Sequence, residues 1–279
     1  MKILKSSTKN KISVLMAVHF KDSPEHFASA LDSLKPFVSG LYSTIIVADG
    51  PLTNQLEKVI NKRIKSIKIE LIKLSISRGL GQALNVGVKN SKSDFLLRMD
   101  ADDLSRPERL DVLLDFLHKK PNVDVIGSYI AEFNIKPSKN DRIRKVPLDH
   151  NKIVKQTKIW CAMNHVTCLL RKESILKVGG YQGGKGFSED WWLWARLIQD
   201  GATFINIKKV LVDVRIDNGF IKRRSGFIKF KEDLRLAQMM YKINFINWYH
   251  FIIIFASRLF QRLAPSFIVT LTYFFIRKL

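Results

Sequence analysis

The stretch Phe95-Leu96-Leu97-Arg98-Met99-Asp100-Ala101-Asp102-Asp103 decides the fold. Its first five residues have the length and apolar character of a buried strand, which we expect to end at Asp100. The three carboxylates that follow repel one another, and a divalent cation such as Mg²⁺ or Mn²⁺, which prefers hard oxygen ligands, would offset that repulsion. The alternative is a solvated acidic turn in which Asp103 or Ser105 caps a helix starting at Pro107.

Strand-like and helix-like patterns alternate on both sides of this stretch. The expected strands cover residues 12–18, 44–48, 67–72, 95–99, 123–126, 166–170, 203–207 and 210–216. The expected helices cover residues 24–37, 52–64, 81–89, 107–118 and 188–199, and residues 130–150 are expected to form an irregular excursion or a strand pair. This alternation predicts an α/β fold with a mainly parallel sheet covered by helices on both faces. Ligands bind beyond the carboxyl ends of such strands, so the loops 19–22, 49–51 and 100–103 are candidate sites.

Two further candidates follow predicted strands. Asp49 ends the strand 44–48, where its carboxylate could accept hydrogen bonds from a base or a ribose; the alternative is a turn residue ahead of Gly50. Arg78 and Gly79 precede a predicted helix, and the arginine together with the helix N-terminus could hold a phosphate. The alternative for Arg78 is an exposed arginine without a ligand.

The predicted helix 188–199 opens with two acids, Glu189 and Asp190. Carboxylates are favourable at a helix N-terminus, which Ser188 could cap, and this explains the pair without any function. The functional hypothesis makes one of them a general base that accepts a proton from a substrate hydroxyl. His165 could contact a phosphate or a metal, but a lone histidine is more often a hydrogen-bonded structural residue.

The C-terminal stretch differs in composition from the rest. Residues 219–279 contain eleven Lys or Arg and only two acids, and the apolar runs 245–256 and 266–276 are too short to cross a bilayer. Short apolar runs with basic residues between them favour helices that lie in the interface of an anionic membrane. The alternative is a helical pair packed on the domain. We therefore predict a catalytic domain at 1–225 and a membrane-associating helical tail at 226–279.

The net charge of +22 predicts anionic partners, which include nucleic acid, an anionic membrane and phosphorylated substrates. Two cysteines are too few for a disulfide framework and suit a reducing compartment. We find no secretory signal before Ile12, which predicts a cytoplasmic location.

Several short motifs occur in a characteristic order. They are Val14-Leu15-Met16-Ala17-Val18, Val47-Ala48-Asp49-Gly50, Arg78-Gly79-Leu80 with Asn85, Arg98 to Asp103 followed by Pro107-Glu108-Arg109, Val178-Gly179-Gly180-Tyr181, Ser188-Glu189-Asp190, and Val214-Arg215 with Arg223-Arg224. In this ordered set the chain resembles family 2 glycosyltransferases of the GT-A fold across about residues 11–225. It looks most like the bacterial members that build O-antigen and other surface polysaccharides.

The resemblance implies an inverting, metal-dependent transfer of a sugar. Asp190 would be the catalytic base, and Asp100 and Asp102 would hold Mn²⁺ or Mg²⁺. The nucleotide-sugar site would comprise Ala17, Asp49, Arg78, Gly79, Asp100, Arg223 and Arg224. The family's usual first acid before Asp49 is replaced by Ala48, which leaves one carboxylate for base recognition.

The substrates implied are a UDP-hexose donor and a lipid-linked acceptor at the cytoplasmic face of the inner membrane. Galactose from UDP-galactose, transferred in β linkage to a GlcNAc-diphosphate-lipid or a lipid-linked oligosaccharide, is the first expectation; UDP-glucose and UDP-GlcNAc are alternative donors. The Gln-x-x-Arg-Trp signature of processive synthases is absent from the sequence, so we predict that the enzyme adds a single sugar. Two other classes remain open: a nucleic-acid-binding protein, for which no motif is found, and a nucleotidyltransferase.

Overall fold

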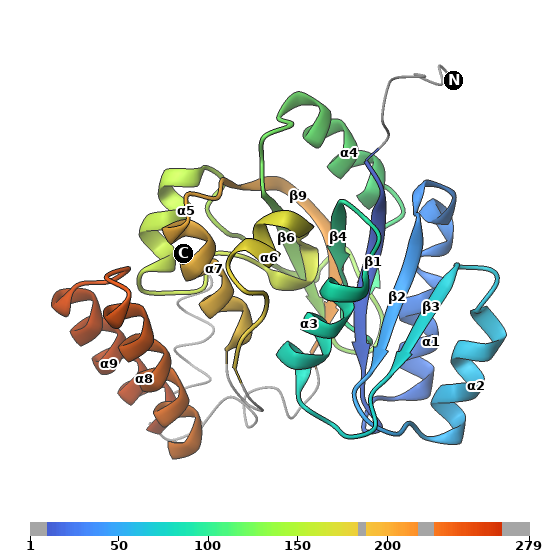
Figure 1. Ribbon diagram of the computed structural model, residues 1–279, viewed down its shortest axis with the longest axis horizontal. Coiled ribbons are helices and arrows are strands. Elements are labelled where there is room, and N and C mark those ends of the chain that lie inside the picture. Colours follow the sequence, from blue (N-terminus) through green and yellow to red (C-terminus); the bar gives the residue numbers. More distant parts are fainter. Residues whose placement is uncertain (1–9, 184–187, 217–225, 264–279) are drawn as a thin grey trace.

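The computed structural model describes residues 10–183, 188–216 and 226–263 (Figure 1). The strands are β1 (Ile12–Val18), β2 (Ser43–Ala48), β3 (Ile69–Lys73), β4 (Phe95–Arg98), β5 (Leu104–Ser105), β6 (Val125–Phe133), β7 (Arg142–Arg144), β8 (Leu169–Arg171) and β9 (Phe204–Arg215). The α-helices are α1 (Pro24–Asp32), α2 (Asn54–Arg63), α3 (Leu80–Asn90), α4 (Arg109–Lys119), α5 (His150–Thr157), α6 (Lys172–Lys177), α7 (Glu189–Gln199), α8 (Phe227–Lys242) and α9 (Trp248–Leu263). Short 3₁₀ helices cover Lys35–Gly40 and His165–Thr167.

The N-terminal half of the sheet is parallel, as the alternating pattern predicts. The strands lie in the order β3-β2-β1-β4, and each neighbouring pair is parallel. The chain moves outward from β1 to β3 and then returns to place β4 on the other side of β1. This reversal between β1 and β4 is the point at which open α/β sheets bind ligands.

The C-terminal half departs from the predicted mainly parallel sheet. Strand β8 is antiparallel to both of its neighbours, β4 and β6, while β9 is parallel to β6. The small strands β5 and β7 also pair antiparallel. The sheet is therefore mixed. Between β6 and β8 the chain passes through β7, α5 and the 3₁₀ helix His165–Thr167.

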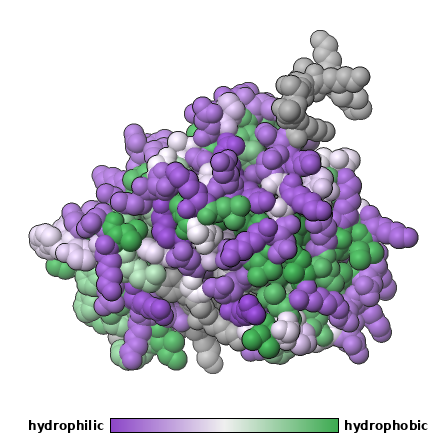
Figure 2. Space-filling view, viewed as in Figure 1, coloured by the Kyte–Doolittle hydropathy of each residue, from purple (hydrophilic) through white to green (hydrophobic). Residues whose placement is uncertain are grey.

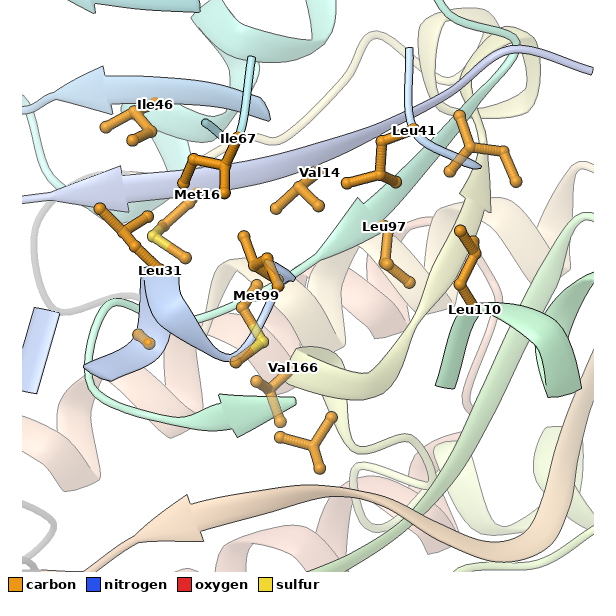
Figure 3. Close-up of a cluster of buried hydrophobic side chains, with 14 of the residues drawn as sticks. Val14, Met16, Leu31, Leu41, Ile46, Ile67, Leu97, Met99, Leu110 and Val166 are labelled. Carbon is orange, nitrogen blue, oxygen red and sulfur yellow. The ribbon is translucent and has the colours of Figure 1, made fainter. Parts of the chain in front are cut away.

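Helices cover both faces of the sheet and bury one apolar cluster on each. Side chains of α1, α2 and α4 pack with Val14 and Met16 of β1 in the cluster shown in Figure 3. On the opposite face, α3 and α7 pack with Leu15 of β1 and Ile45 of β2. Successive residues of β1 thus enter different clusters, which explains why this strand reads as one continuous apolar run.

Helices α8 and α9 form a hairpin that packs on α7 and builds a third apolar cluster there. The guanidinium of Arg258 lies between Trp160 and Trp191, 4.2 and 5.1 Å from the two ring centroids. Asp233 is buried beside it and accepts a hydrogen bond of 2.8 Å from Arg262. The apolar run 266–276 lies outside the described residues. Within the described part of the chain, no helix has the length and apolarity that a membrane span requires.

The buried Asp233 should contribute strongly to stability. Its side chain is 3% exposed and faces Arg258 and Arg262, so Asp233→Asn would remove a buried carboxylate that compensates the charge of the buried Arg258. We expect a loss of about 3 kcal/mol in the free energy of unfolding, measured in urea. Glu232→Gln, at the adjacent surface ion pair with Lys229, should cost less than about 1 kcal/mol. Equal losses in the two variants would contradict this ranking.

Candidate functional site

A cavity of about 540 Å³ opens where β1, β2 and β4 end. Its walls come from these strand ends, from the loop before α3, and from the first residues of α7 and α8. The lining residues are Ala17, Val18, His19, Lys21, Asp22, Asp49, Ser77, Gly79, Leu80, Asp100, Ala101, Asp102, Glu189 and Lys229. The cavity therefore occupies the reversal point of the sheet and brings together both halves of the chain.

Asp49 organises the loop that forms one wall of this cavity. Its carboxylate accepts hydrogen bonds from the backbone N–H groups of Arg78 and Gly79, at 2.7 and 3.0 Å, and from the Ser77 hydroxyl at 3.0 Å. Gly50 makes the close approach possible, because a Cβ on it would lie 2.9 Å from the Ser77 nitrogen and its φ is +93°. The predicted role of Asp49 in binding a base is thus accompanied by a structural role that the sequence did not reveal.

Gly50→Ala tests this close approach. Both the left-handed backbone and the contact with Ser77 oppose a side chain, so we expect a loss of about 2–3 kcal/mol in unfolding free energy. Gly201→Ala is the matched control, because its φ is +88° but nothing lies within 4 Å of its added Cβ. Denaturation in urea should give Gly201→Ala a free energy of unfolding at least about 1 kcal/mol higher than that of Gly50→Ala. The close-approach argument fails if both variants are equally stable.

A buried arginine lies behind the acidic cluster. Arg98, at the end of β4, has no exposed surface; its guanidinium forms an ion pair with Asp100 and also donates to the Met99 carbonyl. Burial opposes the charge of Arg98, but Asp100 and other nearby acids outweigh burial and raise its pKa. A second buried arginine, Arg109, donates to the Arg98 carbonyl at 2.7 Å and so braces the strand end.

The three acids after β4 have different surroundings. Asp100 and Asp102 line the cavity, whereas Asp103 is buried and accepts the backbone N–H of Arg215 at 2.8 Å. Asp103 therefore ties β4 to the end of β9. Helix α4 begins at Arg109 without a side-chain cap, so the alternative in which Asp103 or Ser105 caps a helix from Pro107 is wrong.

A third carboxylate, Asp22, reaches the cavity from the loop after β1, where it accepts the His19 N–H at 2.8 Å. Although Asp102 is accessible from the cavity, burial by the surrounding walls raises its pKa to about 6, and repulsion from Asp100 and Asp22 adds to the shift. Burial likewise raises the pKa of Asp22. Negative charge is thus crowded at this wall.

This donor set fits a divalent cation that is shared with a substrate. Among the described residues, no three His, Cys, Asp or Glu side chains gather into a complete protein cage. The cavity instead offers two adjacent carboxylates, Asp100 and Asp102, with open space in front of them. Mg²⁺-type sites commonly combine one or two carboxylates with waters and substrate phosphates.

The raised pKa of Asp102 predicts a pH dependence. A carboxylate binds a cation only after losing its proton, so binding of a divalent cation at Asp100 and Asp102 should weaken as the pH falls through about 6, approaching about tenfold per pH unit. Calorimetric titration with Mn²⁺ between pH 5 and 8 measures this effect. Asp102→Asn should remove the step, and a flat wild-type profile would contradict the assignment.

The two acids at the start of α7 differ in position. Glu189 lines the cavity, and burial, reinforced by Asp190, raises its pKa to about 7. Asp190 is not among the lining residues; one of its oxygens accepts the Trp191 N–H at 2.7 Å and the other faces the Cys161 thiol at 3.6 Å. Gly81 leaves room for this arrangement, since a Cβ there would lie 2.9 Å from the Glu189 Cβ.

The other predicted residues divide into three groups. Ala17 and Gly79 line the cavity, as a nucleotide site requires, while the side chain of Arg78 is exposed and outside the lining. Arg223 and Arg224 lie outside the described residues. His165 is half-buried and hydrogen-bonded to the Tyr181 hydroxyl at 2.8 Å, as expected for a structural histidine.

The structure differs from the sequence-based predictions at one helix cap and adds residues to the lining of the cavity. Ser188 precedes α7 but makes no side-chain capping bond. Asp22 lies in the loop 19–22, which was predicted as a candidate site without this residue being singled out. Lys229 lines the cavity without having been predicted, because it is one of many basic residues in the C-terminal stretch.

Comparison with known proteins agrees with this geometry. The model of glycosyl transferase family 2 matches residues 13–180. A UDP-Gal:alpha-D-GlcNAc-diphosphoundecaprenol beta-1,3-galactosyltransferase of Escherichia coli is 35% identical over 92% of each chain. The O-antigen biosynthesis glycosyltransferase WbnJ of Escherichia coli is 30% identical over 74% of this chain and 80% of its own.

The crystal structure of S. aureus TarS residues 1–349 with UDP-GlcNAc superposes with a TM-score of 0.69 at 16% identity, covering 90% of this chain and 72% of TarS, which shows a shared fold. The resemblance inferred from the ordered motifs is thereby confirmed: the chain is a glycosyltransferase and belongs to glycosyl transferase family 2.

Proposed function

We propose that the protein transfers a hexose with inversion, from a UDP-sugar to a lipid-diphosphate-linked sugar, in the synthesis of O-antigen or another surface polysaccharide. The observation that carries this proposal is that one cavity has Asp100 and Asp102 on one wall and the start of α7 on another. Galactose from UDP-galactose, added in β linkage to GlcNAc-diphosphate-lipid, is the proposed reaction. The name of the 35% identical relative supports this choice.

In the proposed reaction, Asp190 accepts the proton of the acceptor hydroxyl as the oxygen attacks the anomeric carbon. Its Oδ2 faces only a weak thiol donor, so it retains capacity for that proton. Asp100 and Asp102 would hold Mn²⁺ or Mg²⁺. When bound, the cation would stabilise the charge on the leaving diphosphate. We place the nucleotide along Ala17, Asp49 and Gly79.

The basic residues have a proposed role in the same scheme. Arg78 lies beside the N-terminus of α3, where the helix dipole and the side chain would both favour phosphate. Arg223 and Arg224 are proposed to neutralise diphosphate charge of the donor or the acceptor. The protein would act at the cytoplasmic face of the inner membrane, where its tail associates with the lipid surface.

A transfer assay tests the proposal directly. The purified full chain is incubated with Mn²⁺, a short-chain GlcNAc-diphosphate-lipid and each of UDP-galactose, UDP-glucose and UDP-GlcNAc. We expect UDP release and one added sugar with UDP-galactose, and loss of both with EDTA. Transfer from another UDP-sugar would correct the donor alone. In a parallel incubation of UTP with a sugar 1-phosphate, formation of a UDP-sugar with release of pyrophosphate would identify a nucleotidyltransferase. A salt-sensitive DNA mobility shift without donor binding would favour nucleic-acid binding.

A further inference from the structure

The α8–α9 hairpin exposes two chemically different faces. On α9 the exposed large apolar side chains recur at helical spacing and include Trp248, which is 66% exposed, and Ile252, which is 53% exposed. The full set on α9 is Trp248, Tyr249, Ile252, Phe255, Leu259 and Phe260. On α8 the exposed residues include a basic row, Lys231, Arg235 and Lys242, with Ile228 at its start, and the aromatic Phe227 and Tyr241 are exposed as well. We call these residues together the hairpin surface.

The acids of the hairpin do not neutralise this surface. Glu232 pairs with Lys229 at 2.7 Å, and Asp233 is buried against Arg262. Figure 2 shows hydrophobic and hydrophilic residues side by side over the end of the molecule that carries α8 and α9. Within the described residues, Lys231, Arg235 and Lys242 form no ion pair. A surface that combines large apolar side chains with such basic ones matches the interface of an anionic bilayer. A second copy of the chain fits less well, because it would bring two basic rows together.

The hairpin surface extends to the mouth of the cavity. Lys229 lines the cavity, and its neighbour Ile228 is 76% exposed. The start of α8 and the end of α9 lie side by side, with the Gly226 N–H donating to the Arg262 carbonyl at 2.8 Å. An occupant of this surface would therefore lie next to the opening through which an acceptor enters.

The hairpin is also fixed to the helix that carries the proposed base. Arg258 of α9 packs on Trp191, the residue directly after Asp190, and Leu236, Met240 and Ile254 share an apolar cluster with α7. Because the hairpin packs on α7, whose first residue lines the cavity, the hairpin and the cavity keep a fixed position relative to each other.

We infer that the hairpin surface docks on an anionic lipid bilayer, with α9 inserting its apolar side chains and α8 contacting headgroups. This holds the mouth of the cavity at the membrane. The inference rests on the proposed function only in giving the acceptor a lipid anchor.

Vesicle sedimentation with the full chain tests the docking. We expect binding to vesicles containing 30% phosphatidylglycerol in phosphatidylcholine, weaker binding to phosphatidylcholine alone, and weakening by salt. Ile252→Glu should reduce the affinity at least about tenfold, and Lys231→Glu with Arg235→Glu roughly 30-fold. The matched controls at the C-terminal end of α2 and just beyond it, Ile64→Glu and Lys62→Glu with Lys65→Glu, change exposed residues of the same kinds and should bind like the wild type.

Transfer activity separates docking from catalysis. On a short-chain soluble acceptor all of these variants should match the wild type, whereas on a long-chain acceptor in vesicles the hairpin variants alone should lose activity. Equal vesicle binding by hairpin and control variants would overturn the inference. So would a wild-type dimer that Ile252→Glu dissociates, which would assign the surface to a second copy. Vesicle binding without transfer to any acceptor would refute the proposed function while leaving the docking intact.

Discussion

Asp190→Asn should lower kcat by about 10²–10⁴-fold while leaving the affinity for UDP in the presence of Mn²⁺ unchanged. The substitution keeps the shape of the side chain and the acceptance of the Trp191 N–H, but the amide cannot take a proton from the acceptor hydroxyl. Initial rates of UDP release at saturating donor and acceptor measure the effect. Calorimetry of UDP binding on the same sample shows that the cavity is intact.

Glu189→Gln is the matched control, because Glu189 adjoins Asp190 and lines the cavity. We expect it to change kcat less than about tenfold, since its part is to shape the wall and to add negative charge. A large loss in Glu189→Gln with nearly full activity in Asp190→Asn would move the base to Glu189. In that case the rate should rise with pH through about 7, where Glu189 loses its proton.

Asp102→Ala should abolish metal-dependent donor binding. Removing one of the two carboxylates that face the open part of the cavity should weaken Mn²⁺-dependent UDP binding by at least about 100-fold, because the charge of the diphosphate loses most of its compensation. Isothermal titration with UDP, with Mn²⁺ or with EDTA, measures the difference. The variant should bind UDP equally weakly in both conditions.

Asp111→Ala controls for the loss of an aspartate elsewhere. Asp111 is exposed in the first turn of α4 and does not line the cavity, so its removal should leave binding unchanged. Unchanged Mn²⁺-dependent affinity in Asp102→Ala would show that the cation site lies elsewhere, and Asp22 would then be the next carboxylate to replace.

The sequence predicted the parallel half of the sheet because its strands are buried on both faces. Strand β1 occupies Ile12–Val18 as expected, since each of its residues packs in the core or against a neighbouring strand. Strand β6 was expected to end at Ile126 but continues to Phe133. Its second part includes Ser128 and Glu132, which are buried where this part pairs with β7 and β9 from later in the chain. Because the pairing partners are distant in sequence, the residues of β6 themselves show no apolar pattern that would predict this part of the strand.

The candidate site was predictable where a carboxylate follows a strand and less so elsewhere. Asp100 and Asp102 lie in the cavity because a strand end fixes their position. The two acids of α7 could not be separated, because the residue that faces the cavity depends on the rotation of the helix. Lys229 joins the cavity through the docking of α8 on α7, which is a tertiary contact.

The third apolar cluster has a consequence for biosynthesis. Trp191 and Trp192 on α7 are covered by residues of α8 and α9, which the ribosome makes after α7. About 70 residues separate Asp190 from the end of α9, so at typical rates of synthesis the nascent chain exposes these tryptophans for about 4–15 s. A chain stopped before the hairpin would keep them uncovered and should aggregate. The apolar cover of α7 is therefore completed only after the α8–α9 hairpin has been synthesised.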